Sequence, residues 1–268
     1  KGLQEDVVWR EDVLPFIIQY PDNMREIWHY CFTEILNNAI DHSSGTNVVI
    51  TLRKTAINSE IMIYDNGEGI FKKIQRELNL LDERHAILEL QKGKLTTDPD
   101  NHTGEGIFFS SRLMDDFYIF SNGTSYSHNL EDDNDWILEK EVYKNGTGVF
   151  MTLRNNTSKS IKKIFEEYAS KKDDYGFNKT IVPVRLAQYG EETLVSRSQA
   201  KRLLARLDRF KTVIFDFKGV NHIGQAFADE IFRVFKNQNR HTDILHINAN
   251  EEVESMIMRA ILVEELSK

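Results

Sequence analysis

The sequence predicts an α/β protein: a larger two-layer α/β sandwich followed by a smaller α/β domain. Two observations predict this. The chain has 268 residues, enough for one large domain or two ordinary ones. Its apolar residues recur with helical spacing in some segments and alternate as in strands in others. We expect domains at residues 1–157 and 179–268, joined by a helical connector at 158–178.

The first domain contains the clearest helix signal, at residues 23–42. Asn23 and Glu26 have capping-box spacing, and Gly45 follows the end of the segment. One arc of about 140° is apolar and predicts a core face; it holds Trp28, Phe32, Ile35, Leu36, Ala39 and Ile40. We expect further helices at 71–91 and 106–114, a Pro-containing loop at 98–101, and strands at 47–54, 60–64, 117–121, 136–143 and 148–154.

The second domain alternates strands and helices more simply. Strands are expected at 180–186, 212–217 and 243–248, and helices at 196–209, 226–236 and 251–264. Ser196 and Ser198 stand where helix-capping residues are expected. This alternation predicts a small sheet with helices packed on it.

Composition excludes several classes of protein. Hydrophobic residues make up 40% and charged residues 28%, as in soluble globular proteins. No apolar run approaches the ~18–20 residues that cross a bilayer, and no signal-peptide pattern is visible. The single cysteine, Cys31, excludes an internal disulfide and fits a reducing cytoplasm. The net charge of −8 argues against nucleic-acid contact in these residues. The chain begins at Lys1 rather than Met, so we expect an upstream segment, which could bind nucleic acid.

The helix at 23–42 also carries a polar stripe. Glu34, Asn37, Asn38 and Asp41 cover about 100° opposite the apolar face. A solvated face is the ordinary interpretation, but Asn is a poor helix former, and two adjacent Asn residues favour a role for their side chains. An Asn carbonyl oxygen can bind Mg²⁺ without adding charge beside a triphosphate. A Glu one turn earlier could accept a proton from an attacking water.

Two glycine loops follow the helix. Asp65-Asn-Gly-Glu-Gly-Ile70 comes after a strand, where Asn-Gly alone is most often a hairpin turn; alternatively, Asp65 accepts the amino group of adenine. His102-Thr-Gly-Glu-Gly-Ile107 leads into a helix, whose first N–H groups form an anion site, although taken alone this pattern is more often an ordinary loop or cap. The second loop is neither a P-loop nor a dinucleotide motif, because no Gly-Lys-Ser/Thr follows and no strand directly precedes it.

Together and in this order, these elements resemble the GHKL ATPase family, which includes DNA gyrase B and the histidine kinases. Residues 34–42 look like its N box, 65–70 its G1 box and 104–106 its G2 box, and Asn145-Gly-Thr-Gly-Val149 looks like its adenine-supporting strand. The resemblance implies a Bergerat-type ATP-binding fold with Mg²⁺ on Asn38 and a mobile lid at 71–103, from which Lys92 or Lys94 could reach the phosphates. The implied ATP-binding set is Asn38, Asp41, Asp65, Gly67, Gly69, Ile70, Lys94, Thr103, Gly104, Gly106, Ile107 and Thr147.

Glu34 bears on the reaction. Hydrolysing and Ser/Thr-kinase members of the family have Glu four residues before the metal-binding Asn, whereas histidine kinases have Asn there. The resemblance therefore implies an ATPase with Glu34 as general base. The alternatives are a Ser/Thr protein kinase acting on another protein, and a binding switch that holds ATP without turnover.

Residues 180–265 resemble the STAS-like fold of anti-sigma-factor antagonists, most clearly from Val213 to Asp229. Phosphorylated antagonists carry Ser or Thr after the strand, but this chain has Gly224, Gln225 and Ala226 there, so we expect no phosphorylation switch at that place. The two resemblances imply a cytoplasmic bacterial regulator. In it, ATP-driven lid closure controls the STAS-like domain, a protein partner or a homodimer.

Overall fold

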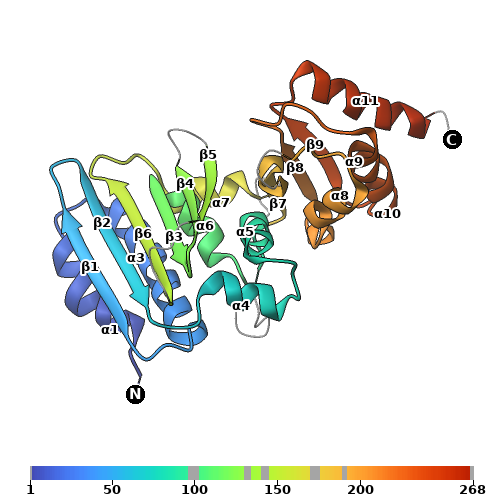
Figure 1. Cartoon of the computed structure of the whole chain (residues 1–268). Helices are drawn as coiled ribbons and strands as arrows, with labels where there is room; N and C mark the ends of the chain where they lie inside the picture. Colours follow the sequence, from blue (N-terminus) through green and yellow to red (C-terminus); the bar gives the residue numbers. More distant parts are fainter. Residues whose placement is uncertain are drawn as a thin grey trace. The chain divides into compact units, whose positions relative to one another are not determined.

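The structure is a computed structural model that describes residues 2–95, 103–129, 134–139, 145–169, 176–188 and 192–265 (Figure 1). The chain divides into two compact units, Lys1–Glu167 and Tyr168–Lys268. The division falls within the segment 158–178 that the sequence predicts as a connector. Residues 96–102 of the predicted lid, with the loop at 98–101 and His102, lie outside the described residues, as do residues 140–143 of one predicted strand.

The first unit is a layer of helices on an antiparallel sheet of order β1-β2-β6-β3-β4-β5, which confirms the predicted α/β sandwich. The strands are β1 (Val48–Lys54), β2 (Asn58–Asp65), β3 (Asp116–Ser121), β4 (Thr124–Asn129), β5 (Asn134–Glu139) and β6 (Thr147–Arg154). β6 comes last in the sequence but lies between β2 and β3. Its first residue therefore pairs with the last residue of β2, Thr147 with Asp65.

Sequence reasoning missed β4. Asn122 and Gly123, both with positive φ, turn the chain from β3 into it, as in the commonest hairpin turns. The strand reads Thr-Ser-Tyr-Ser-His-Asn, in which only Tyr126 is a large apolar residue. Its polar composition hides the alternation that would predict a strand.

The helices of the first unit differ from the prediction in two places. They are α1 (Glu5–Val8), η1 (Trp9–Val13), α2 (Leu14–Ile17), α3 (Asp22–Asn37), η2 (Asn38–His42), α4 (Ile70–Glu77), α5 (Glu83–Lys92), α6 (Gly106–Leu113) and α7 (Ile161–Glu167). The prediction of a single helix at 71–91 is wrong. Asn79 adopts a left-handed conformation between two helices, and the side chain of Asp82 accepts a hydrogen bond from the N–H of His85 and so caps the second one. The cap predicted at Asn23 is also wrong, since its side chain donates to the carbonyls of Thr157 and Lys159.

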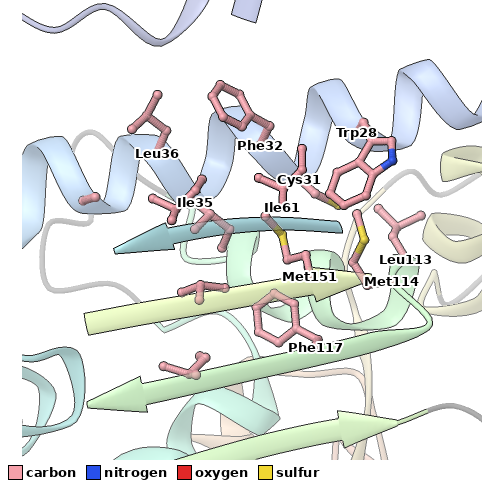
Figure 2. Close-up of a cluster of buried hydrophobic side chains, with 14 of the residues drawn as sticks. Trp28, Cys31, Phe32, Ile35, Leu36, Ile61, Leu113, Met114, Phe117 and Met151 are labelled. Atoms are coloured by element: carbon pink, nitrogen blue, oxygen red, sulfur yellow. The ribbon is translucent and has the colours of Figure 1, made fainter. Parts of the chain in front are cut away.

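The core lies between α3 and the sheet. Figure 2 shows Trp28, Cys31 and Ile35 of α3 in one buried cluster with Ile61, Phe117 and Met151 of the central strands. This packing holds α3 across the sheet, so that its last turns lie near the end of β2 and the start of β6, where the polar stripe and the first glycine loop meet.

The second unit has the predicted strand–helix alternation. A parallel sheet of order β7-β8-β9 is built from Lys179–Pro183, Thr212–Asp216 and Asp243–Ile247. Ser196 and Gln199 form a capping box at the start of α8, as expected for Ser196. The accompanying helices are η3 (Val184–Ala187), α8 (Arg197–Leu204), η4 (Leu207–Arg209), α9 (Gln225–Asp229), η5 (Glu230–Phe235), α10 (Lys236–Gln238) and α11 (Glu251–Glu265). Throughout the described part of the chain, every helix is too short or too polar to span a bilayer.

Candidate functional site

The first unit contains a cavity of about 280 Å³. Its walls come from α3 and η2, the ends of β2 and β6, α4, α5, and the segment from 103 into α6. Most of the predicted site residues line it: Glu34, Asn38, Asp65, Gly69, Ile70, Thr103, Gly104, Gly106, Ile107 and Thr147. The structure places Asp41, Gly67 and Lys94 outside this lining. Glu34 and Asn38 of the polar stripe therefore face the same space as both glycine loops, whereas Asn37 does not line it.

Asp65 and Thr147 form one end of the cavity. Both are buried, with exposed fractions of 4% and 8%. The N–H of Gly67 donates to Asp65 Oδ1 over 2.8 Å, and the N–H of Ile70 donates to Thr147 Oγ1 over 2.9 Å. Thr147 thus holds the first glycine loop against β6, and Gly67 orients the carboxylate without itself lining the cavity.

The environment of Asp65 suits recognition of a hydrogen-bond donor. Burial raises the pKa of its carboxyl above the ordinary value, while the backbone N–H groups of Gly67 and Thr147 act in the opposite direction. Ile63 and Val149, both buried, line the cavity beside it. A buried acceptor between apolar side chains can bind a flat ring that carries an amino group.

Glu34 and Gly106 form the other end. A Cβ atom built on Gly106 would lie 2.1 Å from Glu34 Oε2, so the start of α6 lies directly against this carboxylate. Glu105, which also lines the cavity, has its pKa raised by burial; the charge of Lys94 opposes the shift, and that of Glu34 adds to it. Lys94, although it does not line the cavity, therefore lies close enough for its positive charge to stabilise the carboxylate of Glu105.

Asn38 lies between the two ends, one turn beyond Glu34 on the same continuous helix. From Asn38 to His42 the helix takes the wider π-type winding. With more residues per turn, His42, four residues on, stays on the cavity side, whereas Asp41, three residues on, turns away and is exposed. The sequence stripe assumed regular α-helical winding and for that reason included Asp41.

Two lysines near the cavity differ from expectation. Lys92 is buried and paired with Glu89 over 2.5 Å, and it does not line the cavity. Lys73 of α4, which sequence reasoning missed, lines the cavity and donates from Nζ to the His42 carbonyl over 2.7 Å. Its spacing three residues after Ile70 was the available signal, because residues three apart share a helix face.

The donor set limits what metal the cavity could hold. The described residues contain no group of three or more His, Cys, Asp or Glu side chains arranged to bind a metal. The cavity instead offers one amide oxygen, on Asn38, near open space. This fits magnesium, which takes most of its ligands from phosphate and water, and it does not fit a metal that needs a full protein cage.

Two family models match parts of this chain. Residues 16–126 match the family model of the histidine kinase-like ATPase domain, and residues 199–254 match a STAS-like domain of unknown function. Over residues 16–126 the first unit is similar to histidine kinase-like ATPase domains. Both resemblances seen in the sequence are thereby confirmed, and the ATPase family supports nucleotide binding by the first unit.

Among the matching solved structures is the 43K ATPase domain of gyrase B from Thermus thermophilus, in complex with an aminocoumarin. It is 18% identical, the match covers 53% of this chain and 37% of that chain, and the TM-score is 0.31. The chain thus spans just over a third of the length of the gyrase B chain. No curated protein matches this sequence.

Proposed function

We propose that the histidine kinase-like ATPase unit binds Mg²⁺-ATP in the cavity and transfers the γ-phosphoryl group to water, with Glu34 as general base. One observation carries this proposal: a single cavity holds a buried acceptor at one end, a carboxylate beside a helix start at the other, and an amide between them.

The acceptor end accounts for selection of the base. The 6-amino group of adenine donates to the carboxylate of Asp65, and Thr147 supports the contact by holding the loop. Ala39, Ile63 and Val149 supply the apolar surface for the ring. Guanine carries a carbonyl oxygen where adenine has its amino group, so it would face Asp65 with a second acceptor and bind poorly.

The helix that bears Glu34 and Asn38 sets the direction of the phosphate chain. Successive turns advance about 5.4 Å, so these two residues mark successive positions away from the nucleoside end. The first N–H groups of α6, at Gly106 and Ile107, form an anion site at the far end. The γ-phosphate would therefore lie on the cavity side of Glu34 and of the start of α6, which are next to each other.

Asn38 would hold the magnesium ion through its amide oxygen. When bound, the ion supplies positive charge to the β- and γ-phosphate oxygens. Asn38 contributes no negative charge of its own, which suits a position beside a triphosphate. Asp41 faces away from the cavity, so Asn38 is the ligand from this helix.

Glu34 would activate the attacking water. As the water oxygen bonds to the γ-phosphorus, Glu34 takes its proton, and the bond from phosphorus to the bridging oxygen breaks to release ADP. The same carboxylate would equally activate a serine hydroxyl, so phosphorylation of a separate protein is the second candidate. The STAS-like unit is an unsuitable acceptor at the corresponding position, because residues 224–226 are Gly-Gln-Ala and carry no hydroxyl.

The STAS-like unit makes the chain a regulator in this proposal. Closure of residues 71–103 over ATP would change the contacts of that unit, of a protein partner or of a homodimer, and hydrolysis would reset them. A cytoplasmic location belongs to the same proposal, since the reaction uses cellular ATP.

Incubation with γ-labelled ATP tests the reaction, with and without cell lysate and alongside Glu34→Gln as the matched control. We expect wild-type protein to release labelled phosphate and Glu34→Gln to release far less. Labelled protein in the lysate would favour the kinase activity. ATP binding with neither labelled phosphate nor labelled protein would refute hydrolysis and favour a switch that only binds ATP. Absence of ATP binding in calorimetry would refute the whole proposal.

A further inference from the structure

We propose that Lys73 binds the α-phosphate of the nucleotide and supplies positive charge that the cavity needs. This inference rests on the proposed function and adds a residue and a phosphate position to it. The observation behind it is that Lys73, half-buried on α4, lines the cavity and has its ammonium group 2.7 Å from the His42 carbonyl.

The charges around the cavity call for a cation. Three lining residues are carboxylates: Glu34, Asp65 and Glu105. Within the described lining, Lys73 is the single lysine or arginine. A nucleoside triphosphate adds further negative charge, and one magnesium ion at Asn38 offsets only part of it. A fixed ammonium group in the wall lowers the cost of bringing the phosphates in.

Its position points to the α-phosphate. His42, whose carbonyl Lys73 contacts, is one turn beyond Asn38 and two turns beyond Glu34 on the same helix. The loop that carries Asp65 meets this end too, since the N–H of Glu68 donates to the Ser43 carbonyl over 3.0 Å. Lys73 is therefore at the nucleoside end of the phosphate path, and the phosphate attached to the nucleoside is the α-phosphate.

The hydrogen bond to the His42 carbonyl leaves other donors of the Lys73 ammonium group for a ligand. A lysine near a helix end commonly donates to its last carbonyls, which is a purely structural role. An ammonium group has three donors, however, so one can stay on the His42 carbonyl while others face a phosphate. The His42 contact then aims the side chain, and a capping role and a binding role are compatible.

Calorimetric titration of Lys73→Met with adenosine, AMP and ATP separates the two roles. Because a hydrogen bond to a charged group is worth about 1.5–3 kcal/mol, we expect AMP and ATP to bind about 10–150-fold more weakly, with adenosine unchanged. Lys73→Arg should retain most of the affinity. Lys72→Met is the matched control, since Lys72 lies on the same helix but is exposed and does not line the cavity; it should bind all three ligands like the wild type.

Three outcomes would overturn the assignment. Equal weakening of adenosine and AMP would show that Lys73 only shapes the pocket. Weaker ATP with unchanged AMP would place the lysine at the β- or γ-phosphate. Unchanged binding of every ligand would remove it from the site. If the wild-type protein binds neither adenosine nor ATP, the proposed function fails instead, and the wild-type titration shows this separately.

Discussion

Replacing Asp65 with asparagine changes one atom at the nucleoside end of the cavity. In the wild type, Oδ1 accepts the N–H of Gly67 over 2.8 Å. Asparagine keeps this bond by placing its own oxygen there. Its amide nitrogen then occupies the place of the second carboxylate oxygen and presents donors where an acceptor stood.

The magnitude follows from this exchange. The amino group of adenine would meet another donor at a site that is only 4% exposed, where water cannot compensate. A mispaired buried polar group costs about 1–3 kcal/mol. ATP should therefore bind about 5–150-fold more weakly. Inosine triphosphate carries a carbonyl oxygen in place of the amino group, so its affinity for Asp65→Asn should rise.

The same substitution should leave the ligand-free fold intact or more stable. Burial raises the pKa of Asp65 in the folded state, so the folded protein holds that proton more tightly than the unfolded chain does. Stability from this group is thus greatest at low pH and is lost as pH rises through the folded pKa. Asparagine removes the buried charge, and the melting temperature at neutral pH should equal or exceed that of the wild type. The difference should shrink on acidification.

Calorimetry with ATP and inosine triphosphate, together with melting curves from acidic to neutral pH, checks both parts. Wild-type affinity for ATP in Asp65→Asn would remove Asp65 from the adenine contact. Equal loss of both nucleotides with a lower melting temperature would show a damaged pocket rather than a reversed hydrogen-bond pattern. Either result would refute the reasoning.

Other substitutions test the reaction and the packing. Glu34→Gln should retain ATP affinity and lower phosphate release about 10²–10⁴-fold; unchanged release in a phosphate assay would exclude the general base. Gly146→Ala should lower the melting temperature by several degrees, because φ is +92° and a Cβ would lie 2.0 Å from the Asp65 carbonyl oxygen. Gly148→Ala is its control, with the nearest atom 3.7 Å away, and equal melting of the two variants would contradict the geometry. Ser59→Ala should cost about 1–3 kcal/mol in urea unfolding, because it removes the acceptor of the buried Trp28 Nε1–H; a smaller loss would mean that another acceptor replaces it.

Much of the site could be predicted because its signals are local. Glu34 and Asn38 share a helix face by spacing alone, and both glycine loops stand beside recognisable strands or helices. The residues that were missed or misplaced depend on finer geometry. The π-type winding exchanges Asp41 for His42 in the cavity wall. Spacing puts Lys73 on the same face of α4 as Ile70, but only the packing of α4 against the end of η2 turns that face to the cavity.

The sequence by itself determined two α/β domains, the apolar face of α3 and the three motifs of the ATPase unit, because each is written in the spacing of neighbouring residues. Only the tertiary structure decided that β6 lies between β2 and β3 and so brings Thr147 beside Asp65. Strand order depends on contacts between segments far apart in the chain, and no local period encodes it. The cavity exists because that long-range pairing and the packing of α3 on the sheet are satisfied together.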